Sequence, residues 1–229
     1  MRPLLNIDAG EYEHESDALY ALADALNIAC GGHAGDAHSI RRVLRACALR
    51  GTRAGAHPSY PDRANFGRRT LTINEADLAL SITSQCSALI EAAREVETPI
   101  VHLKLHGALY HDANRSEPLA RLCLDAALQA LGRVVIVGPA QGTWRNEAKA
   151  RALDYLVEGF ADRGVRDDGT LIPRDQPGAL ITDAHACAAR AQQLAQQGIG
   201  TICVHGDTEN ALAIARAVQG TLRALNGQR

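Results

Sequence analysis

Apolar residues along this chain are grouped in short runs, and each run is followed by a longer segment with the spacing of an amphipathic helix. An apolar run of about four to eight residues, bounded by glycine, proline or polar residues, is typical of a buried strand. Seven such runs predict strands at residues 4–8, 26–30, 52–56, 100–106, 133–138, 154–160 and 201–205.

The segments between these runs predict helices with recognisable ends. Between Asp36 and Gly51, apolar residues at positions 40, 43, 44 and 47 share one helical face, with an acid before them and a glycine after them. Ser116, followed by glutamate and proline, starts another helix, whose buried stripe we expect at positions 119, 122, 123 and 126. Further helices are predicted at residues 16–25, 74–98, 141–150, 183–198 and from 208 onward.

The alternation of strands and helices predicts a parallel sheet, because a parallel connection needs a crossover long enough to hold a helix. Seven strand–helix units in 229 residues favour an α/β fold that closes into a seven-stranded parallel (β/α) barrel, one unit fewer than the common eight. An open, doubly wound sheet is the alternative. Because the composition shows no break and no low-complexity segment, residues 1–229 are predicted to form a single domain.

Residues that can carry chemistry are concentrated at the ends of the predicted strands. The stretch N-I-A-C-G-G-H-A-G-D at 27–36 joins a strand to a helix through a glycine-rich turn that contains His33. Because the carboxyl ends of parallel strands lie on one face of a barrel, we expect such residues to converge around one opening. They are Asp8, Glu11, His33, His57, His106, Asp162, His205 and Asp207.

The predicted strand at 100–106 contains V-H-L-K-L-H, in which polar and apolar residues alternate. A period of two places His102, Lys104 and His106 on one side, toward the barrel interior, and the aliphatic residues toward the helices. Burying a lysine without an acidic partner is costly. We therefore expect a carboxylate beside Lys104, supplied by Asp8 or Asp207.

Two loops are longer than a connector requires, and we expect them to have a function. The first, A-H-P-S-Y-P-D-R-A-N-F-G-R-R, begins at residue 56, and the second runs from residue 162 to residue 177. Arg163 in the second loop could hold an anionic group through two parallel hydrogen bonds. The alternative for Arg163 is an ordinary surface charge.

Histidines, carboxylates and a lysine around one opening are suited to hydrolysis at a carbonyl group. A carboxylate or an imidazole would activate water, and a lysine or an imidazolium would stabilise the developing oxyanion. Asp8, His33 and His57 are also candidate ligands for a divalent metal ion. For each histidine the alternative is a structural role, and His205 could simply cap the last helix.

Composition narrows the possible functions. The net charge is −2 with both signs interspersed, so nothing indicates binding to nucleic acid or to an anionic membrane, and no apolar run approaches the roughly 20 residues that span a bilayer. The six cysteines form no C-x-x-C pair and are expected to be reduced core residues of a cytoplasmic protein. The sequence contains no P-loop, no G-x-G-x-x-G after a strand and no G-x-S-x-G, which argues against P-loop ATPases, dinucleotide-binding enzymes and serine hydrolases.

Several long blocks of the chain resemble the LamB/YcsF family, whose members are regarded as the A-type subunit of the prokaryotic ATP-dependent 5-oxoprolinase. The blocks follow the family order over nearly the whole chain. The chain departs from the family at Ile7, where cysteine is usual, at Gly32, where an aromatic residue is common, and at Leu105, where proline is common. The matching blocks are N-I-A-C-G-G-H-A-G-D (27–36), G-A-H-P-S-Y-P-D (55–62), F-G-R-R (66–69), H-L-K-L-H-G-A-L-Y (102–110), E-G-F-A-D-R-G-V-R-D-D-G-T-L-I-P-R (158–174) and V-H-G-D (204–207).

The resemblance implies a seven-stranded barrel similar to the polysaccharide-deacetylase barrels. It also implies opening of the lactam ring of 5-oxo-L-proline to L-glutamate, driven by ATP with Mg²⁺, together with two partner subunits of the B and C types. The residues that it carries over are Asp8, His33, Lys104 and Asp162 as catalytic residues, and Glu11, His57, His106, Arg163, His205 and Asp207 as substrate-binding residues.

Two other functions stay open at the level of the sequence. One is a stand-alone metal-dependent deacetylase or amidohydrolase that uses Asp8, His33 and His57, which would need a bound metal and no ATP. The other is a non-catalytic binding subunit of a larger complex, suggested by the short segment between Glu11 and Asn27.

Overall fold

The computed structural model describes residues 2–166 and 170–225. Contacts between residues divide the chain into two compact units. The terminal unit consists of Met1–Ile7, Ser16–Asp24 and Glu158–Arg229, and the central unit consists of Asp8–Glu15 and Ala25–Val157. Each unit is described by itself below. The prediction of a single domain stays a prediction.

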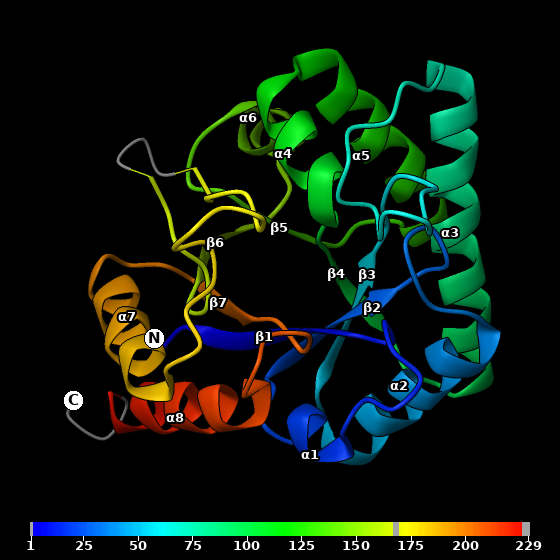
Figure 1. Ribbon diagram of the computed structural model, residues 1–229. Helices are drawn as coiled ribbons and strands as arrows, with labels where there is room; N and C mark the ends of the chain where they lie inside the picture. Colours follow the sequence, from blue (N-terminus) through cyan, green and yellow to red (C-terminus); the bar gives the residue numbers. More distant parts are fainter. Residues whose placement is uncertain (1, 167–169, 226–229) are drawn as a thin grey trace. The chain divides into compact units, whose positions relative to one another are not determined.

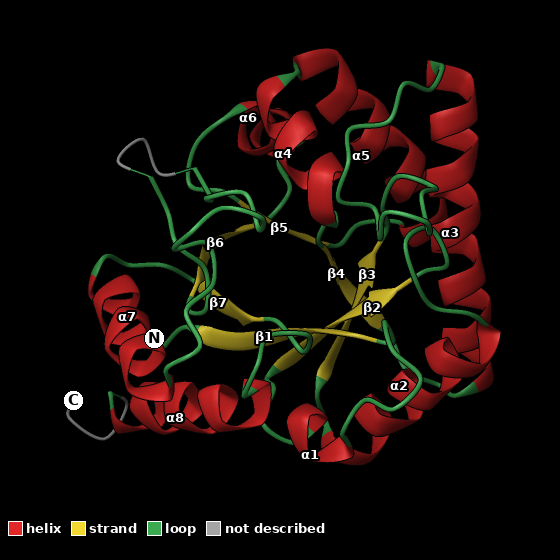
Figure 2. Ribbon diagram, viewed as in Figure 1, coloured by secondary structure: helices red, strands yellow, loops and turns green. Residues whose placement is uncertain are grey.

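Seven strands form a closed barrel in which each strand lies beside the next one in the sequence and β7 lies beside β1 (Figure 1; Figure 2). The strand ladders are parallel, and in the pair of β2 and β3 Ala29 lies opposite His57. The barrel predicted from the sequence is therefore confirmed, and the open sheet is wrong. The strands are β1 (Leu4–Ala9), β2 (Ala25–Ala29), β3 (Arg53–His57), β4 (Ile100–Leu103), β5 (Val135–Gly138), β6 (Tyr155–Phe160) and β7 (Thr201–Val204).

Helices lie outside the strands in both units. In the central unit α3 packs beside α5, and α2 lies next to α3; in the terminal unit α7 packs against α8. Across the described residues, none of the helices combines the length and the apolar character needed to cross a membrane. The helices are α1 (Asp17–Tyr20), α2 (Ala37–Arg50), α3 (Glu75–Glu95), α4 (Gly107–Arg115), α5 (Glu117–Leu131), α6 (Thr143–Ala150), α7 (Ala184–Gln196) and α8 (Ala211–Ala224).

Helix α2 shows why these segments fold as the sequence predicts. The Asp36 side chain accepts a hydrogen bond from the backbone N–H of Ser39 at 2.8 Å, and the Ser39 hydroxyl accepts one from the backbone N–H of Asp36 at 2.9 Å. This reciprocal cap satisfies two N–H groups that a helix end leaves without partners. At the other end Gly51 adopts a φ of 66°, a left-handed conformation that glycine enters without steric cost.

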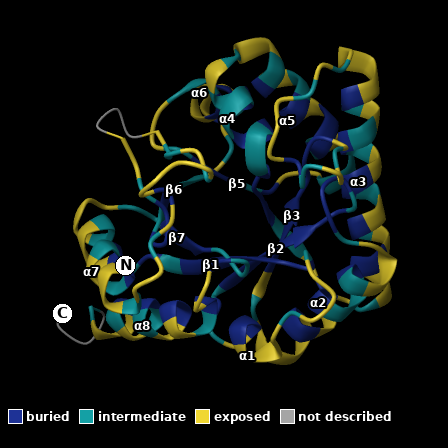
Figure 3. Cartoon of the chain, in the orientation of Figure 1, coloured by how far each residue is buried: buried dark blue, intermediate teal, exposed yellow. Residues whose placement is uncertain are grey.

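Burial follows the predicted pattern in the central unit. Figure 3 colours β2 and β3 as buried, while the outer surface of α3 is exposed. All five residues of β2 are buried, as expected of a strand with packing on both faces. On α3 the periodicity predicts a buried stripe at positions 78, 82, 86, 89 and 90, of which the first four are buried and Ile90 is only partly buried. The helices thus present one apolar face to the strands and a polar face outward.

Some predicted boundaries are wrong. The strand predicted at 100–106 ends at Leu103, and His106 is the N-cap of α4, which the sequence analysis does not predict. Helix α4 is nine residues long with a buried face at positions 109, 110 and 113. This face is too short to give a clear period next to the apolar run before it. The first helix is only four residues long, and the last begins at Ala211 instead of at residue 208.

The buried stripe of α5 is also shifted from its predicted position. Leu119 and Leu122 are only partly buried, whereas Ala120 and Leu124 are fully buried together with Cys123. Alanine carries little weight in a hydrophobic pattern, yet its small side chain lets a helix pack closely. A prediction that follows the larger leucines therefore places the buried face of α5 one residue too early.

The barrel interior of the central unit contains polar side chains that satisfy one another. His102 Nε2 lies 2.8 Å from Asn27 Oδ1, so the imidazole donates to the amide oxygen, and both residues are buried. Gly55 on the neighbouring strand leaves room for this imidazole, because a Cβ atom at that position would collide with the His102 ring. Burial lowers the pKa of His102 to about 3.

We predict that the free energy of unfolding falls as the pH is lowered below about 6.5, in part because of His102. In the unfolded chain His102 takes up a proton near that pH, but in the folded chain it stays neutral down to about pH 3. The unfolded state therefore binds more protons across this window, and acid destabilises the fold. His102→Gln keeps a donor toward Asn27 and removes the titration.

Urea unfolding between about pH 7.5 and pH 5 measures this effect through the slope of stability against pH. The variant should show a slope smaller by up to about one proton. Equal slopes for the variant and the unchanged protein would contradict the assigned neutral state of His102.

Candidate functional site

Six predicted site residues come together in the central unit, at strand ends and in the loops that follow them. They come from the ends of four strands, so residues far apart in sequence become neighbours. Their side chains are almost completely buried. They are Asp8 in β1, Glu11 in the loop after β1, His33 in the loop after β2, His57 at the end of β3, and Lys104 and His106 after β4.

Asp8 and Lys104 form a buried ion pair. Lys104 Nζ lies 2.9 Å from Asp8 Oδ1, and the two side chains are 3% and 4% exposed. Asn27 Nδ2 donates to the same Asp8 oxygen at 2.7 Å. The expected carboxylate partner of Lys104 is therefore Asp8, and Asp207 is paired elsewhere. The cost of desolvating both charges offsets much of their attraction, so a pair this deeply buried depends on well-aligned hydrogen bonds.

Beside the ion pair lie four residues that we call the histidine cluster: Glu11, His33, His57 and His106. One donor atom from each lies within 4.8 Å of all the others, which is a spacing that could hold a metal ion. His106 Nδ1 is 3.0 Å from His57 Nε2, and His33 Nε2 is 2.9 Å from Glu11 Oε1. Asp8 Oδ2 approaches the cluster at 3.3 Å from His57 Nε2.

Backbone carbonyl groups fix the orientation of two of these rings. His57 Nδ1 lies 2.8 Å from the carbonyl oxygen of Lys104, and His106 Nε2 lies 3.0 Å from the carbonyl oxygen of Phe66. A carbonyl oxygen only accepts, so each of these nitrogens carries the proton. In the neutral rings, His57 Nε2 and His106 Nδ1 are then the unprotonated nitrogens, and they face each other.

Two imidazoles of the cluster, those of His33 and His106, favour the neutral form. Burial lowers the pKa of His33 well below its ordinary value, and the nearby His57 lowers it further. Burial likewise lowers the pKa of His106, with His33 and His57 adding to the effect. The His33 and His106 rings are stacked, with centroids 3.6 Å apart and planes 2° from parallel. Neutral imidazoles can act as bases or as metal ligands.

Glu11 is held in place by a neighbour that the sequence analysis did not single out. The carboxylate of Glu15 accepts hydrogen bonds from the backbone N–H groups of Gly10 and Glu11, each at 2.7 Å, and of Tyr12 at 3.2 Å. Arg42 Nη2 lies 3.3 Å from the same carboxylate. Glu15 thus organises the loop after β1. This loop leads into the segment between Glu11 and Asn27, which is short compared with the family.

Phe66 is a second residue that sequence reasoning missed. Its ring meets His33 and His106 edge-on at 5.2 and 5.6 Å between centroids, and its carbonyl orients His106. Phe66 has a φ of 55°, a left-handed conformation that costs free energy for a bulky residue. Gly67 follows, where a Cβ atom would lie 2.9 Å from His33 Cβ. The available signal was the F-G-R-R block in the long loop.

The family departure at Gly32 has a structural counterpart. A Cβ atom on Gly32 would collide with the side chains of Gln85 and Ser59. Gln85 Oε1 accepts from the Ser59 backbone N–H at 3.0 Å, and its Nε2 donates to the Ser59 carbonyl at 2.9 Å. The glycine therefore makes room for a glutamine that braces the loop directly after His57.

The terminal unit holds the four remaining predicted site residues, among them Asp162 and His205. The buried Asp162 carboxylate accepts from the backbone N–H of His205 at 2.8 Å, from His205 Nδ1 at 2.9 Å and from the Thr208 hydroxyl at 2.7 Å. Burial favours the neutral acid, but His205 and these hydrogen bonds hold the pKa of Asp162 below its ordinary value. Asp162 thus fixes the position of His205 and also stabilises the turn after β7.

Arg163 and Arg174 in this unit already have partners within the protein. Arg163 Nε donates to the carbonyl of Ala179 at 3.0 Å, and its Nη2 donates to the carbonyl of Ile172 at 2.7 Å. Arg174 binds Asp207 through two contacts, at 2.7 and 3.2 Å. These contacts organise the described parts of the loop, residues 162–166 and 170–177, and substrate binding by Arg163 and Asp207 stays a prediction.

The cysteines behave as the sequence predicts. All six are free and buried. Cys30, which follows β2 and is the one closest in sequence to His33, donates to the Ile28 carbonyl at 3.0 Å, and burial raises its pKa to about 12. A thiol with such a pKa is a poor nucleophile, so Cys30 is a packing residue.

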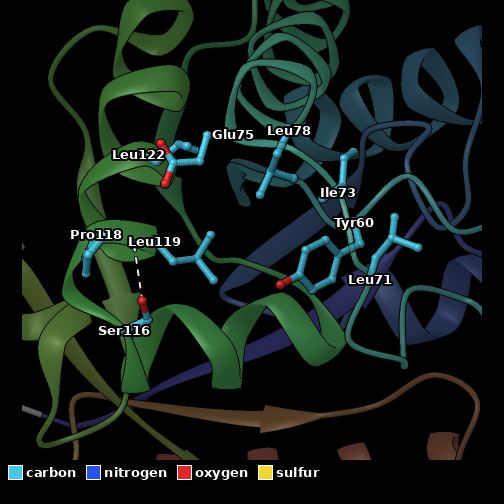
Figure 4. A pocket seen from close by; sticks show the side chains of 9 residues that line it. All are labelled: Tyr60, Leu71, Ile73, Glu75, Leu78, Ser116, Pro118, Leu119 and Leu122. Atoms are coloured by element: carbon cyan, nitrogen blue, oxygen red, sulfur yellow. Dashed lines mark hydrogen bonds between the residues drawn. The ribbon is translucent and has the colours of Figure 1, made fainter.

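A separate cavity of about 230 Å³ lies between α3, α5 and the segment from Tyr60 to Ile73 (Figure 4). Its walls are mainly aliphatic, and the Ser116 hydroxyl at its edge serves as the cap of α5. None of the predicted site residues lines it, so the cavity is a gap between packed elements and not the candidate site. The lining residues are Tyr60, Leu71, Ile73, Glu75, Leu78, Ser116, Pro118, Leu119 and Leu122.

Comparison with solved structures supports the fold described above. The crystal structure of a lactam utilization protein from Thermus thermophilus matches with a TM-score of 0.89 and 30% sequence identity, covering 99% of this chain and 98% of that one. The crystal structure of SacUVDE matches with a TM-score of 0.57 at 8% identity, covering 98% of this chain and 99% of that one, which shows a shared fold alone.

Comparison of sequences is more specific. The A-type subunit of 5-oxoprolinase from Streptomyces avermitilis is 36% identical over 238 aligned residues, which cover 96% of this chain and 95% of that protein. The model of the LamB/YcsF family matches residues 5–228. The chain therefore belongs to the LamB/YcsF family.

Proposed function

We propose that this chain is the A-type subunit of an ATP-dependent 5-oxoprolinase, an enzyme that opens the lactam ring of 5-oxo-L-proline to L-glutamate. The observation that carries the proposal is the buried Asp8–Lys104 pair beside the histidine cluster, in a chain 36% identical to a protein named as a 5-oxoprolinase subunit of this type. The arrangement offers a positive charge, proton acceptors and little bulk water, which together suit hydrolysis of an unreactive amide.

Each chemical requirement of ring opening has a candidate group. Lys104 Nζ, which Asp8 orients, would bind the anionic oxygens that the phosphorylated lactam presents at its reacting carbon. Asp8 or His33 would accept a proton from the attacking water. The water oxygen becomes part of the new carboxylate, and the ring nitrogen gains a proton as the carbon–nitrogen bond breaks. Glu11, His57 and His106 would bind and position the substrate around these groups.

ATP coupling is part of the same proposal. Transfer of the terminal phosphate to the amide oxygen would release ADP and make the carbonyl carbon reactive. Addition of one water and cleavage of the carbon–nitrogen bond would give an acyl phosphate, and a second water would release phosphate and L-glutamate. ATP would be bound with Mg²⁺, and the sequence lacks a P-loop, so we propose that B- and C-type partner subunits contribute to holding it. The cytoplasm is the proposed compartment, because all six cysteines are free.

Asp162 and His205 form the second part of the proposed machinery. The hydrogen bond between Asp162 and His205 Nδ1 fixes the orientation of the imidazole, as in other carboxylate–histidine pairs. In this role Asp162 would tune a proton-transfer group, while Arg163 and Asp207 would act in substrate binding.

A stand-alone metal-dependent deacetylase or amidohydrolase is the second candidate, and the donor atoms of the histidine cluster favour it. It differs from the first candidate in needing no ATP and no partner. A non-catalytic binding subunit is the third. Variants that lose turnover while they still assemble with the partner subunits would argue against that third function.

We predict that Lys104→Met lowers turnover by at least about 100-fold, because it removes the charge that stabilises the oxyanion. The sequence contains only two lysines, and Lys149→Met, at an exposed position on α6, is the matched control. The assay is glutamate release from 5-oxoproline and ATP by this chain combined with candidate B- and C-type subunits. Undiminished turnover by Lys104→Met would refute the role, and activity without ATP would favour the deacetylase.

We also predict that Asp8→Asn destabilises the fold by about 3–5 kcal/mol, because it leaves the buried Lys104 ammonium unpaired. The double variant Asp8→Asn/Lys104→Met removes both charges and should recover much of this loss. Urea unfolding of the two single variants and the double variant measures the coupling. Additive losses would mean that the two charges do not compensate each other, and they would remove the basis for the assigned role of Asp8.

A further inference from the structure

We propose that Glu11, His33, His57 and His106 bind one divalent transition-metal ion. The proposal concerns binding by this chain alone and does not depend on the lactam assignment. It departs from the set expected from the sequence, since Glu11 and His106 replace Asp8 as ligands. The four donor atoms come from the loops after β1 and β2, the end of β3 and the start of α4.

Two imidazole nitrogens of the cluster face each other at close range. His57 and His106 each donate one ring N–H to a backbone carbonyl, at 2.8 and 3.0 Å. Their other nitrogens, Nε2 of His57 and Nδ1 of His106, lie 3.0 Å apart with little access to water. Two lone pairs at this distance repel unless a cation or a proton lies between them. A metal ion bound by both nitrogens removes the repulsion.

The spacing of all four donors also supports a metal site. Metal–nitrogen and metal–oxygen bonds of about 2.0–2.2 Å place neighbouring ligand atoms about 3–3.5 Å apart. The observed separations are 3.0 Å between the facing histidine nitrogens, 2.9 Å from His33 Nε2 to Glu11 Oε1, and 3.4 Å from His106 Nδ1 to Glu11 Oε1. Three of the six donor–donor separations are thus already at coordination distances, and the others lie within 4.8 Å.

The surroundings of the cluster support a metal centre as well. Ligating histidines usually donate their second N–H to a carbonyl or a carboxylate, which fixes their orientation. The carbonyls of Lys104 and Phe66 do this for His57 and His106. Glu15 fixes the backbone of Glu11. His33 Nδ1 is buried without a hydrogen-bond partner among the described residues, so this ring is the least constrained of the three.

The donor set points to a class of metal. Three imidazole nitrogens and one carboxylate suit Zn²⁺ and its first-row neighbours, whereas Mg²⁺ prefers oxygen ligands and retains water. The site would therefore be distinct from the Mg²⁺ that accompanies ATP. Because the His33 and His106 planes are parallel and stacked, one ring must rotate when both coordinate the same ion, and the less constrained His33 is expected to move.

The test uses the purified chain alone, stripped with a chelator and then titrated with Co²⁺ or Zn²⁺, without ATP, lactam or partner subunits. We expect about one ion bound per chain, with the visible absorption of Co²⁺ in a nitrogen-rich site. Loss of a residue that only hydrogen-bonds to a metal ligand typically weakens metal binding by about 10–100-fold. His106→Gln and Glu11→Gln remove ligands themselves and should weaken binding by more than this. His102→Gln removes a buried histidine outside the cluster and should bind like the unchanged protein.

Thermal unfolding of the unchanged protein gives a second measurement that does not depend on whether the variants fold. Zn²⁺ should raise the melting temperature, and Mg²⁺ at the same concentration should not, because only an ion bound by the folded state stabilises it. Failure of the unchanged chain to retain Co²⁺ or Zn²⁺ after desalting would overturn the proposal. Equal affinity in His106→Gln and the unchanged protein would overturn it as well. Neither result bears on whether the assembled enzyme turns over 5-oxoproline with ATP.

Discussion

The carboxylate of Asp8 is the group on which the site in the central unit depends. One of its oxygens accepts from Lys104 Nζ and Asn27 Nδ2, and the other faces His57 Nε2. Lys104 can stay charged inside the barrel only because this carboxylate lies against it. Through Asn27 the same network reaches His102 in the interior layer. The polar groups of β1, β2, β3 and β4 therefore support one another, and removing one of them leaves its neighbours buried without compensation.

The histidine cluster is held by backbone groups as much as by side chains. The Lys104 and Phe66 carbonyls determine which nitrogen of His57 and of His106 is free, and Glu15 determines where the loop bearing Glu11 lies. The left-handed conformation of Phe66 carries a conformational cost, of a kind found most often where geometry serves function. Such rigid support keeps donor groups in position before a ligand arrives, which is what catalysis and metal binding both require.

The sequence predicts much of this architecture, but not the orientation of individual side chains. Strand periodicity and strand-end chemistry lead to the barrel, to His33, His57, Lys104 and His106, and to Asp8 as one of two possible partners of Lys104. They cannot give the orientation of the His106 ring, because this orientation depends on the Phe66 carbonyl. No local sequence pattern predicts the left-handed backbone conformation of Phe66. The role of Glu15 was missed for a similar reason, since its carboxylate binds backbone N–H groups and leaves no side-chain motif. Helix α4 was missed because its short apolar face follows directly on an extended apolar segment.

The central claim is that the imidazoles of His57 and His106 present unprotonated nitrogens to a shared cation. Long-range ¹H–¹⁵N NMR on protein with ¹⁵N-labelled histidine, saturated with Zn²⁺ at neutral pH, observes this directly, because it reports which nitrogen of each ring carries the proton. We expect a proton on Nδ1 of His57 and on Nε2 of His106, with the facing nitrogens shifted as metal ligands. A proton on either facing nitrogen would contradict it.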